Sequence, residues 1–214
     1  MCGIVGLYLK KRDLAGEIGE LFSSMLICMS DRGPDSAGFA LYGNEPPAGY
    51  IKITLRHDGD DYDWQVLADR FGHRFACEAE LQINANYAVI AVRADEGALA
   101  CAVADIDPAL AIMSIGRSIE ILKEIGSPES IVDRFDIRSM RGTHIIGHTR
   151  MATESAVTTD GSHPFSTGMD LCLVHNGSLS NHNRLRGLLE RAGIEIRTQN
   201  DSEVAAGYLM WRMQ

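Results

Sequence analysis

The second residue of the chain carries two groups that could act together in catalysis. The sequence begins Met1-Cys2-Gly3, and Cys2 is small enough for the initiator Met1 to be trimmed. Cys2 would then present a thiol and a free α-amino group. The thiolate is a strong nucleophile that needs help to lose its proton, and an α-amino group with a pKa of roughly 7.7–8.0 can act as the general base. The structural alternative is that Cys2 is a small buried hydrophobe that opens a strand.

Polar clusters recur where the expected strands and helices begin or end. Taken singly, each has an ordinary explanation, because Asn176-Gly177 suits a hairpin turn and Asp201 suits a helix cap. Behind the opening Cys-Gly-Ile-Val-Gly, four such clusters follow one another at residues 32–38, 147–153, 175–179 and 200–203. Their combination in this order is far more specific than any one of them.

This set of motifs resembles the class II glutamine amidotransferase domain, the glutaminase family with an N-terminal nucleophile. The resemblance is strongest to stand-alone glutamate-synthase-like amidotransferase subunits, and it runs from Cys2 to Glu203 with little match in the middle. The fold it implies is α+β: a four-layer αββα sandwich of two mostly antiparallel sheets, the Ntn-hydrolase fold.

The resemblance assigns the chemical step to three residues. Cys2 would attack the side-chain amide carbon of L-glutamine and form a thioester. The side-chain amide of Asn176 and the backbone N–H of Gly177 would stabilise the tetrahedral oxyanion. The products would be glutamate and ammonia.

Five further residues match positions around the substrate in the family pattern. Arg150 would hold the α-carboxylate of glutamine, with Thr153 as a nearby hydroxyl donor. Asp201 would hold the α-ammonium group. Arg32 is expected to support the Cys2 loop, and His163 matches a loop histidine of the family whose role is less defined.

The resemblance also implies partners. Ammonia would pass to a glutamate-synthase-like subunit or domain, so we expect a hetero-oligomer and no cofactor in this chain; FMN, with an iron–sulfur cluster as a further candidate, would belong to the partner. One alternative is another N-terminal-nucleophile amide hydrolase. A second is a non-catalytic or regulatory subunit that keeps the fold while its partner uses an external amine such as methylamine.

Length, net charge and cysteine content limit the number of domains, the binding partners and the cellular compartment that we expect. The 214 residues predict one domain, residues 1–214, with an insertion at about 48–142. A net charge of −9 argues against binding to nucleic acid or a membrane surface. Five widely spaced cysteines without a Cys/His cluster indicate no metal site and a reducing, cytoplasmic setting.

Periodicity and turn residues predict the elements that must position these side chains. We expect strands at 2–9, 38–42, 143–149 and 171–175, and helices from about 15, at 118–125, at 183–192 and from 201. A short strand is expected at 194–197. Family domains continue beyond the last of these helices, so we expect a fragment or a fold completed by a second chain.

Overall fold

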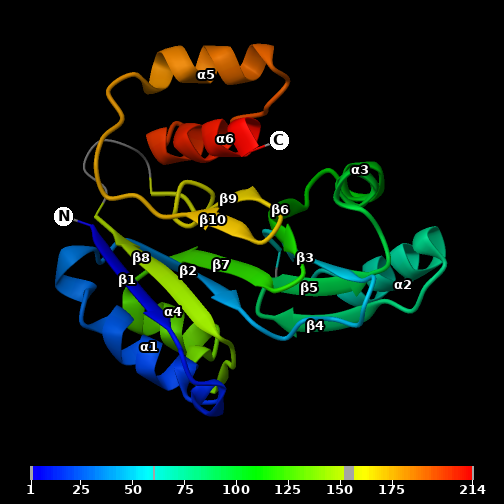
Figure 1. Cartoon of the computed structure of the whole chain (residues 1–214), viewed down its shortest axis with the longest axis horizontal. Coiled ribbons are helices and arrows are strands. Elements are labelled where there is room, and N and C mark those ends of the chain that lie inside the picture. Colours follow the sequence, from blue (N-terminus) through cyan, green and yellow to red (C-terminus); the bar gives the residue numbers. More distant parts are fainter. Residues whose placement is uncertain (1, 60, 152–156, 214) are drawn as a thin grey trace.

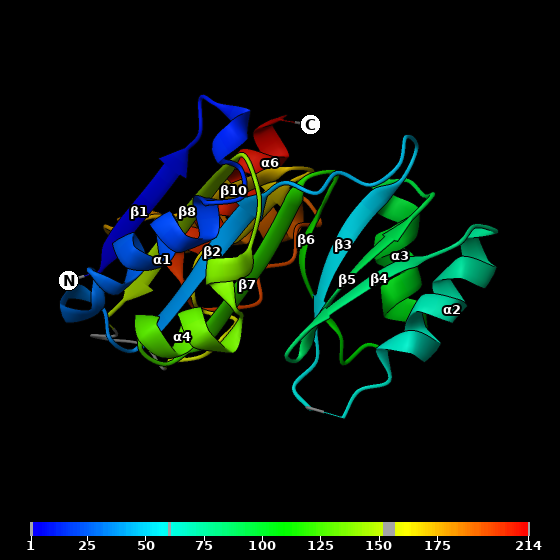
Figure 2. The same cartoon turned by 90° about the horizontal axis from the view of Figure 1, so that it is seen from below.

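Two four-stranded antiparallel sheets lie side by side in the computed structural model, which describes residues 2–59, 61–151 and 157–213 (Figures 1 and 2). A two-stranded hairpin forms a third, smaller sheet. Three short 3-10 turns connect the elements, at Arg12–Leu14, Ser30–Arg32 and Ile137–Ser139.

The first sheet carries the amino terminus. In order across the sheet, its strands are β1 (Gly3–Tyr8), β8 (His144–Arg150), β2 (Ser36–Tyr42) and β7 (Ile119–Ile125). Helices α1 (Ile18–Ile27) and α4 (Pro128–Arg134) cover one face. The core beneath them is aromatic, because Phe22 and Phe135 both pack against Phe39 of β2 and all three are fully buried.

The opposite face of this sheet is covered in two further layers (Figure 1). The hairpin β9 (Phe165–Gly168) and β10 (Leu171–Leu173) lies above the sheet. Helices α6 (Asp201–Met213) and α5 (His182–Arg191) lie above the hairpin. The order helix, sheet, sheet, helix confirms the expected α+β class and its layered arrangement, with a hairpin as the second sheet.

The second four-stranded sheet comes from one continuous stretch and has its own core. Across the sheet its strands are β4 (Glu80–Asn84), β5 (Tyr87–Val92), β3 (Ile51–Arg56) and β6 (Ala111–Gly116). Helices α2 (Trp64–Phe75) and α3 (Glu96–Ile106) pack on it, and Phe71 and Leu99 meet Ile53 and Ile90 in its apolar core. We call this unit, residues 51–116, the inserted sheet. It occupies only part of the stretch 48–142, because β7 and α4 belong to the first sheet.

Two expected elements were wrong. Residues 119–125 form strand β7, not a helix. Its charged residues obscure the pattern because Glu120 and Lys123 are buried, and Glu120 pairs at 2.6 Å with Lys52 from the inserted sheet. Residues 194–197 form no strand; there Glu203 of α6 accepts the N–H of Arg197 at 2.8 Å.

None of the helices formed by residues 2–59, 61–151 and 157–213 is long and apolar enough to cross a membrane.

Candidate active site

Strand pairing places Cys2 beside the end of β8. Gly3 pairs with Thr149, so Cys2 lies next to the point where β8 ends at Arg150. The Cys2 thiol points to the carbonyl of Met151, with Sγ 3.9 Å from the oxygen. Cys2 is half-buried rather than sealed in the core, which an attacking nucleophile requires. Met1, whose removal the chemistry needs, lies outside the described residues.

Glycines let the Arg32 turn approach this strand end. A Cβ on Gly33 would lie 2.5 Å from the carbonyl carbon of Thr149 and 2.6 Å from the nitrogen of Arg150, so only glycine fits. The amide of Asp35 then donates to the carbonyl of Arg150 at 3.1 Å. The turn therefore reaches the site, and the Arg32 side chain itself is exposed. Its supporting role stays a prediction.

Asn176 directly contacts Cys2, the expected nucleophile. Its side-chain nitrogen Nδ2 donates to the carbonyl oxygen of Cys2 at 3.0 Å. Gly177 follows in an exposed turn, where a Cβ would lie 2.8 Å from Nε2 of His175. Residues that are 174 positions apart in sequence thus meet at one point, and both expected oxyanion donors lie on a turn next to Cys2.

Asp201 connects that turn to the last helix. It is the first residue of α6, and its Oδ2 accepts the N–H of Leu179 at 2.6 Å. Beside it, the Ser202 hydroxyl lies 3.0 Å from Nδ1 of His175. A carboxylate in the first turn of a helix is also favoured by the positive end of the helix dipole. Asp201 therefore lies close to the Asn176 turn, and its other oxygen, Oδ1, accepts from the Ser202 hydroxyl at 3.4 Å.

Arg150 contacts a loop that also contacts Asn200, the neighbour of Asp201 in sequence. The guanidinium is buried, and Nη1 donates to the carbonyl of Gly161 at 3.3 Å. Asn200, which directly precedes Asp201, donates from Nδ2 to the same carbonyl at 2.9 Å. One carbonyl oxygen thus joins the expected carboxylate-binding arginine to the residue next to the expected ammonium-binding aspartate.

His163 is buried, and its ring packs against that of another histidine at a tilt of 31°. Its ring centroid is 4.2 Å from that of His148 and 5.0 Å from that of Phe165. Burial lowers the pKa of His148 to about 4, and burial lowers the pKa of His163 to about 2, with the nearby positive charges of Lys123 and Arg150 acting in the same direction. Both imidazoles are therefore neutral at pH 7.

Thr153 falls within residues 152–156, outside the described residues, so its predicted contact with substrate stays a prediction. Three residues that were not singled out complete the contacts: Gly161, Asn200 and the backbone of Leu179. Asn200 could have been found, because it belongs to the polar cluster at 200–203. Gly161 contributes only a carbonyl, which no side-chain motif reports.

The described part of the chain holds no group of three His, Cys, Asp or Glu side chains placed to bind a metal ion.

The fold and this cluster define a class: an αββα protein with a cysteine next to its amino terminus, and amide, guanidinium and carboxylate groups gathered around it. Comparison with known families agrees. Residues 148–214, which include Arg150, Asn176 and Asp201, match the family model described as a glutamine amidotransferase domain.

Known relatives extend the match to the whole chain. The chain is 54% identical over all 214 residues to the glutamine amidotransferase-like protein GlxB of Rhizobium meliloti, and covers 70% of that protein. It is 32% identical, over 98% of its length and 72% of the relative, to a protein of Methanothermobacter thermautotrophicus named "Putative glutamine amidotransferase". A 105-residue match at 31% identity, 49% of this chain, joins it to 17% of the glutamine–fructose-6-phosphate aminotransferase of Vibrio parahaemolyticus. The chain belongs to the class II glutamine amidotransferase family.

Proposed function

We propose that this chain hydrolyses L-glutamine to glutamate and ammonia through a thioester on Cys2, and passes the ammonia to a glutamate-synthase-like partner. The observation that carries the proposal is the 3.0 Å hydrogen bond from Asn176 Nδ2 to the carbonyl of Cys2. It puts an amide donor, of the kind that stabilises oxyanions, at the residue that bears the nucleophile.

The chemical sequence begins once Met1 has been removed. The free α-amine of Cys2 takes the thiol proton, and the thiolate attacks the side-chain carbonyl carbon of glutamine. The amide of Asn176 has two N–H donors, so one can stay on the Cys2 carbonyl while the other, with the N–H of Gly177, holds the oxyanion. The protonated amine then gives its proton to the leaving nitrogen. Ammonia departs, a thioester remains, and water attacks it to release glutamate and the thiol.

Two opposite charges would select free glutamine. The guanidinium of Arg150 forms a planar fork that suits an α-carboxylate. Asp201 uses Oδ2 for the Leu179 amide, and its second oxygen has lone pairs left for an α-ammonium group. Thr153 is proposed as a further donor to the carboxylate, and His163 as a neutral packing support beneath Arg150.

The destination of the ammonia rests on the sequence resemblance alone. We propose a hetero-oligomer in which a partner subunit carries FMN, with an iron–sulfur cluster as a further candidate, and consumes the ammonia. All five cysteines are free thiols, which supports a reducing compartment such as the cytoplasm for this complex.

The test compares wild type, Cys2→Ala and Cys28→Ala in the full-length protein with its partner subunits. Cys28 is an exposed free thiol at the end of α1, so its loss controls for removing a cysteine. Intact mass establishes whether Met1 is absent, and glutamate release measures hydrolysis. We expect hydrolysis in wild type and Cys28→Ala and none in Cys2→Ala. Hydrolysis by Cys2→Ala would refute the mechanism, and an inactive wild type lacking Met1 would refute the function.

Two further variants separate the chemical step from glutamine binding. Replacing Asn176 by Ala removes one oxyanion donor and should lower kcat by ~10²–10³, whereas replacing Arg150 by Ala should mainly raise KM for glutamine. An unchanged KM in Arg150→Ala would mean that the guanidinium does not bind the carboxylate.

A further inference from the structure

The loop that holds Arg150 is itself held by side chains from outside it. We define the Arg150-facing loop as residues 157–165. Its Gly161 carbonyl accepts from both Arg150 and Asn200, so a shift of that one carbonyl would disturb both side chains. Side chains from three other strands also bind the loop: Lys123 and Glu124 of β7, Arg56 of β3 and Ser36 of β2.

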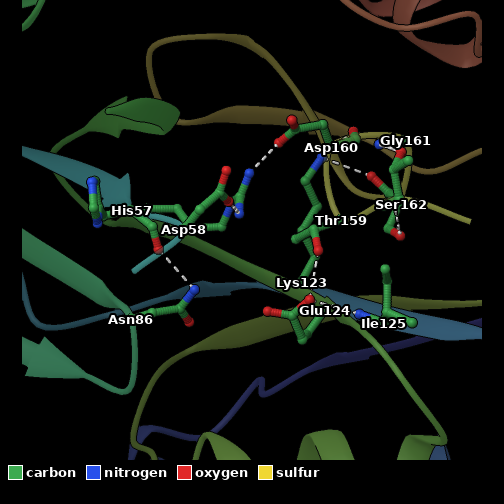
Figure 3. Close-up of polar contacts among 12 residues, drawn as sticks. His57, Asp58, Asn86, Lys123, Glu124, Ile125, Thr159, Asp160, Gly161 and Ser162 are labelled. Atoms are coloured by element: carbon green, nitrogen blue, oxygen red, sulfur yellow. Dashed lines mark hydrogen bonds and ion pairs between the residues drawn. The ribbon is translucent and has the colours of Figure 1, made fainter. Parts of the chain in front are cut away.

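Lys123 fixes the main chain of the loop (Figure 3). Its ammonium group donates to the carbonyls of Asp160 at 2.9 Å, Ser162 at 2.7 Å and Pro164 at 3.4 Å. These bonds use all three ammonium donors and surround Gly161 on both sides. The side chain is buried, and burial lowers the pKa of Lys123 to about 8, so the group is still mostly charged at pH 7. Three aligned carbonyls offset part of the cost of burying that charge.

Side chains of the same loop also form hydrogen bonds with the first sheet. The Thr159 hydroxyl donates to Oε1 of Glu124 at 2.5 Å, next to Lys123 on β7 (Figure 3). The Ser162 hydroxyl lies 2.9 Å from that of Ser36 on β2. The first sheet therefore anchors the loop at residues on both sides of Asp160.

Arg56 ties the loop to the inserted sheet. The residue ends β3, is 7% exposed, and places Nη2 2.8 Å from Oδ1 of Asp160. Its Nη1 also pairs with Asp58. Asp160 is the residue directly before Gly161, and about half of its side chain is exposed. The buried guanidinium of Arg56 thus binds the loop at Asp160, one residue before the carbonyl that accepts from Arg150.

A second residue of the inserted sheet, Tyr87, contacts Lys123, the lysine that binds the loop. The hydroxyl of Tyr87, a fully buried residue of β5, donates to the carbonyl of Lys123 at 2.5 Å. The inserted sheet therefore contacts both the loop, through Arg56, and the lysine that fixes the loop, through Tyr87.

We propose that Arg56 and Asp160 are positioning residues for glutamine binding, and that through them the inserted sheet sets the orientation of Arg150. The inference rests on the glutaminase function proposed above and adds to it a role for a part of the chain that carries none of the matched motifs. Neither residue touches the reacting atoms. Their loss acts on how Arg150 is presented to the α-carboxylate, so it changes substrate binding more than the chemical step.

The size of the effect follows from the exposure of the pair. A partly exposed ion pair contributes up to about 1 kcal/mol, which corresponds to about a fivefold change in an equilibrium constant. Arg56→Gln and Asp160→Asn should therefore each raise KM for glutamine about fivefold, with kcat within about twofold of wild type. The double variant should be no worse than either single variant, because both remove the same interaction. Arg56→Lys, which keeps the charge, should recover part of the loss.

The experiment uses the full chain with its partner subunits and two readouts. Glutamine hydrolysis gives KM and kcat, and hydrogen–deuterium exchange measures protection of the amides in 157–165 without any turnover. The matched control is Arg74→Gln. It removes another ion pair of the inserted sheet unit, Arg74–Asp105 at 2.8 Å, with both side chains largely exposed and no contact with the loop. Asp160→Asn changes a half-exposed side chain, so it keeps the test valid if the buried Arg56 variant unfolds.

Faster exchange across 157–165 together with a raised KM, in the Arg56 and Asp160 variants but not in Arg74→Gln, is the expected result. Wild-type exchange in Asp160→Asn would overturn the inference whatever the activity. Faster exchange with an unchanged KM would overturn the link to glutamine binding. An inactive wild type would refute the proposed function and the glutamine part of the inference, while exchange would still decide whether the ion pair fixes the loop.

Discussion

Acidification from pH 7 to pH 5 should destabilise the fold through two buried histidines whose rings contact each other, His148 and His163. His148 and His163 are almost fully buried. The charges of Arg150 and His175 lower the pKa of both rings, and the charge of Lys123 also lowers that of His163. Burial lowers the pKa of His148 from 6.5 to about 4 and that of His163 to about 2. In the unfolded chain both titrate near 6.5, so below that pH the unfolded state binds more protons than the folded state. Stability is therefore complete above pH 6.5 and falls as the pH drops below it.

The magnitude follows from the pH interval. Each pH unit between the two pKa values contributes about 1.4 kcal/mol per histidine. Pure linkage over the 1.5 units from 6.5 to pH 5 amounts to about 2 kcal/mol for each residue, or about 4 kcal/mol for the pair. Because typical domains have a free energy of unfolding of about 5–15 kcal/mol, this loss is a large share of the total.

Urea unfolding at pH 7, 6 and 5 measures the effect. The informative quantity is the loss of unfolding free energy between pH 7 and pH 5, compared between wild type and His148→Gln. The variant is less stable at pH 7, but its loss on acidification should be smaller by about 2 kcal/mol. His73→Gln, at a solvent-exposed position of α2, controls for removing one imidazole. Equal losses in wild type and His148→Gln would refute the assignment of a neutral, buried imidazole.

Two further substitutions test how the sheets are joined. The buried Lys52 ammonium lies 2.6 Å from Glu120, so Glu120→Gln would leave it without a counter-charge. The free energy of unfolding, measured in urea, should fall by about 3–5 kcal/mol, and a loss below 1 kcal/mol would contradict this. Gly38→Ala would put a Cβ 2.3 Å from the carbonyl oxygen of His163 and should cost about 1–3 kcal/mol, read as a lower Tm. Gly6→Ala, with nothing nearer than 3.9 Å, is its control, and equal Tm values for the two variants would show that the close approach is not needed.

The places of the candidate site residues along the fold could be predicted from sequence, because these side chains lie where elements begin or end. Their roles come from the family resemblance and stay predictions. Cys2 precedes β1, Arg150 ends β8, and Asp201 begins α6. Hydrophobic periodicity locates such boundaries without knowledge of the fold. Once β1 and β8 pair, Cys2 must lie beside Arg150. The segment from Asn176 to Leu179 is then placed by its hydrogen bonds to Cys2 and Asp201.

The error at 118–125 has a different physical origin. A strand that is buried on both faces normally reads as an apolar run, but β7 contains three charged residues. Two of them are buried because they meet partners far away in sequence: Glu120 pairs with Lys52, and Lys123 binds carbonyls of residues 160–164. Local pattern carries no information about those partners, so it could not show that these charges belong to the interior.

The same charges explain why β7 joins the parts of the molecule. A buried ion that loses its partner costs several kcal/mol, so Glu120 restricts where Lys52 of the inserted sheet can lie, and Lys123 restricts the loop that carries Gly161. Both restrictions originate within four residues of one strand. A shift of the inserted sheet relative to β7 would have to break the Glu120 pair or move with it, and Arg56 would carry Asp160 along. The inserted sheet and the Arg150-facing loop are thus coupled through paired charges, which tolerate less displacement than apolar contacts do, because ion pairs and hydrogen bonds depend on direction and distance.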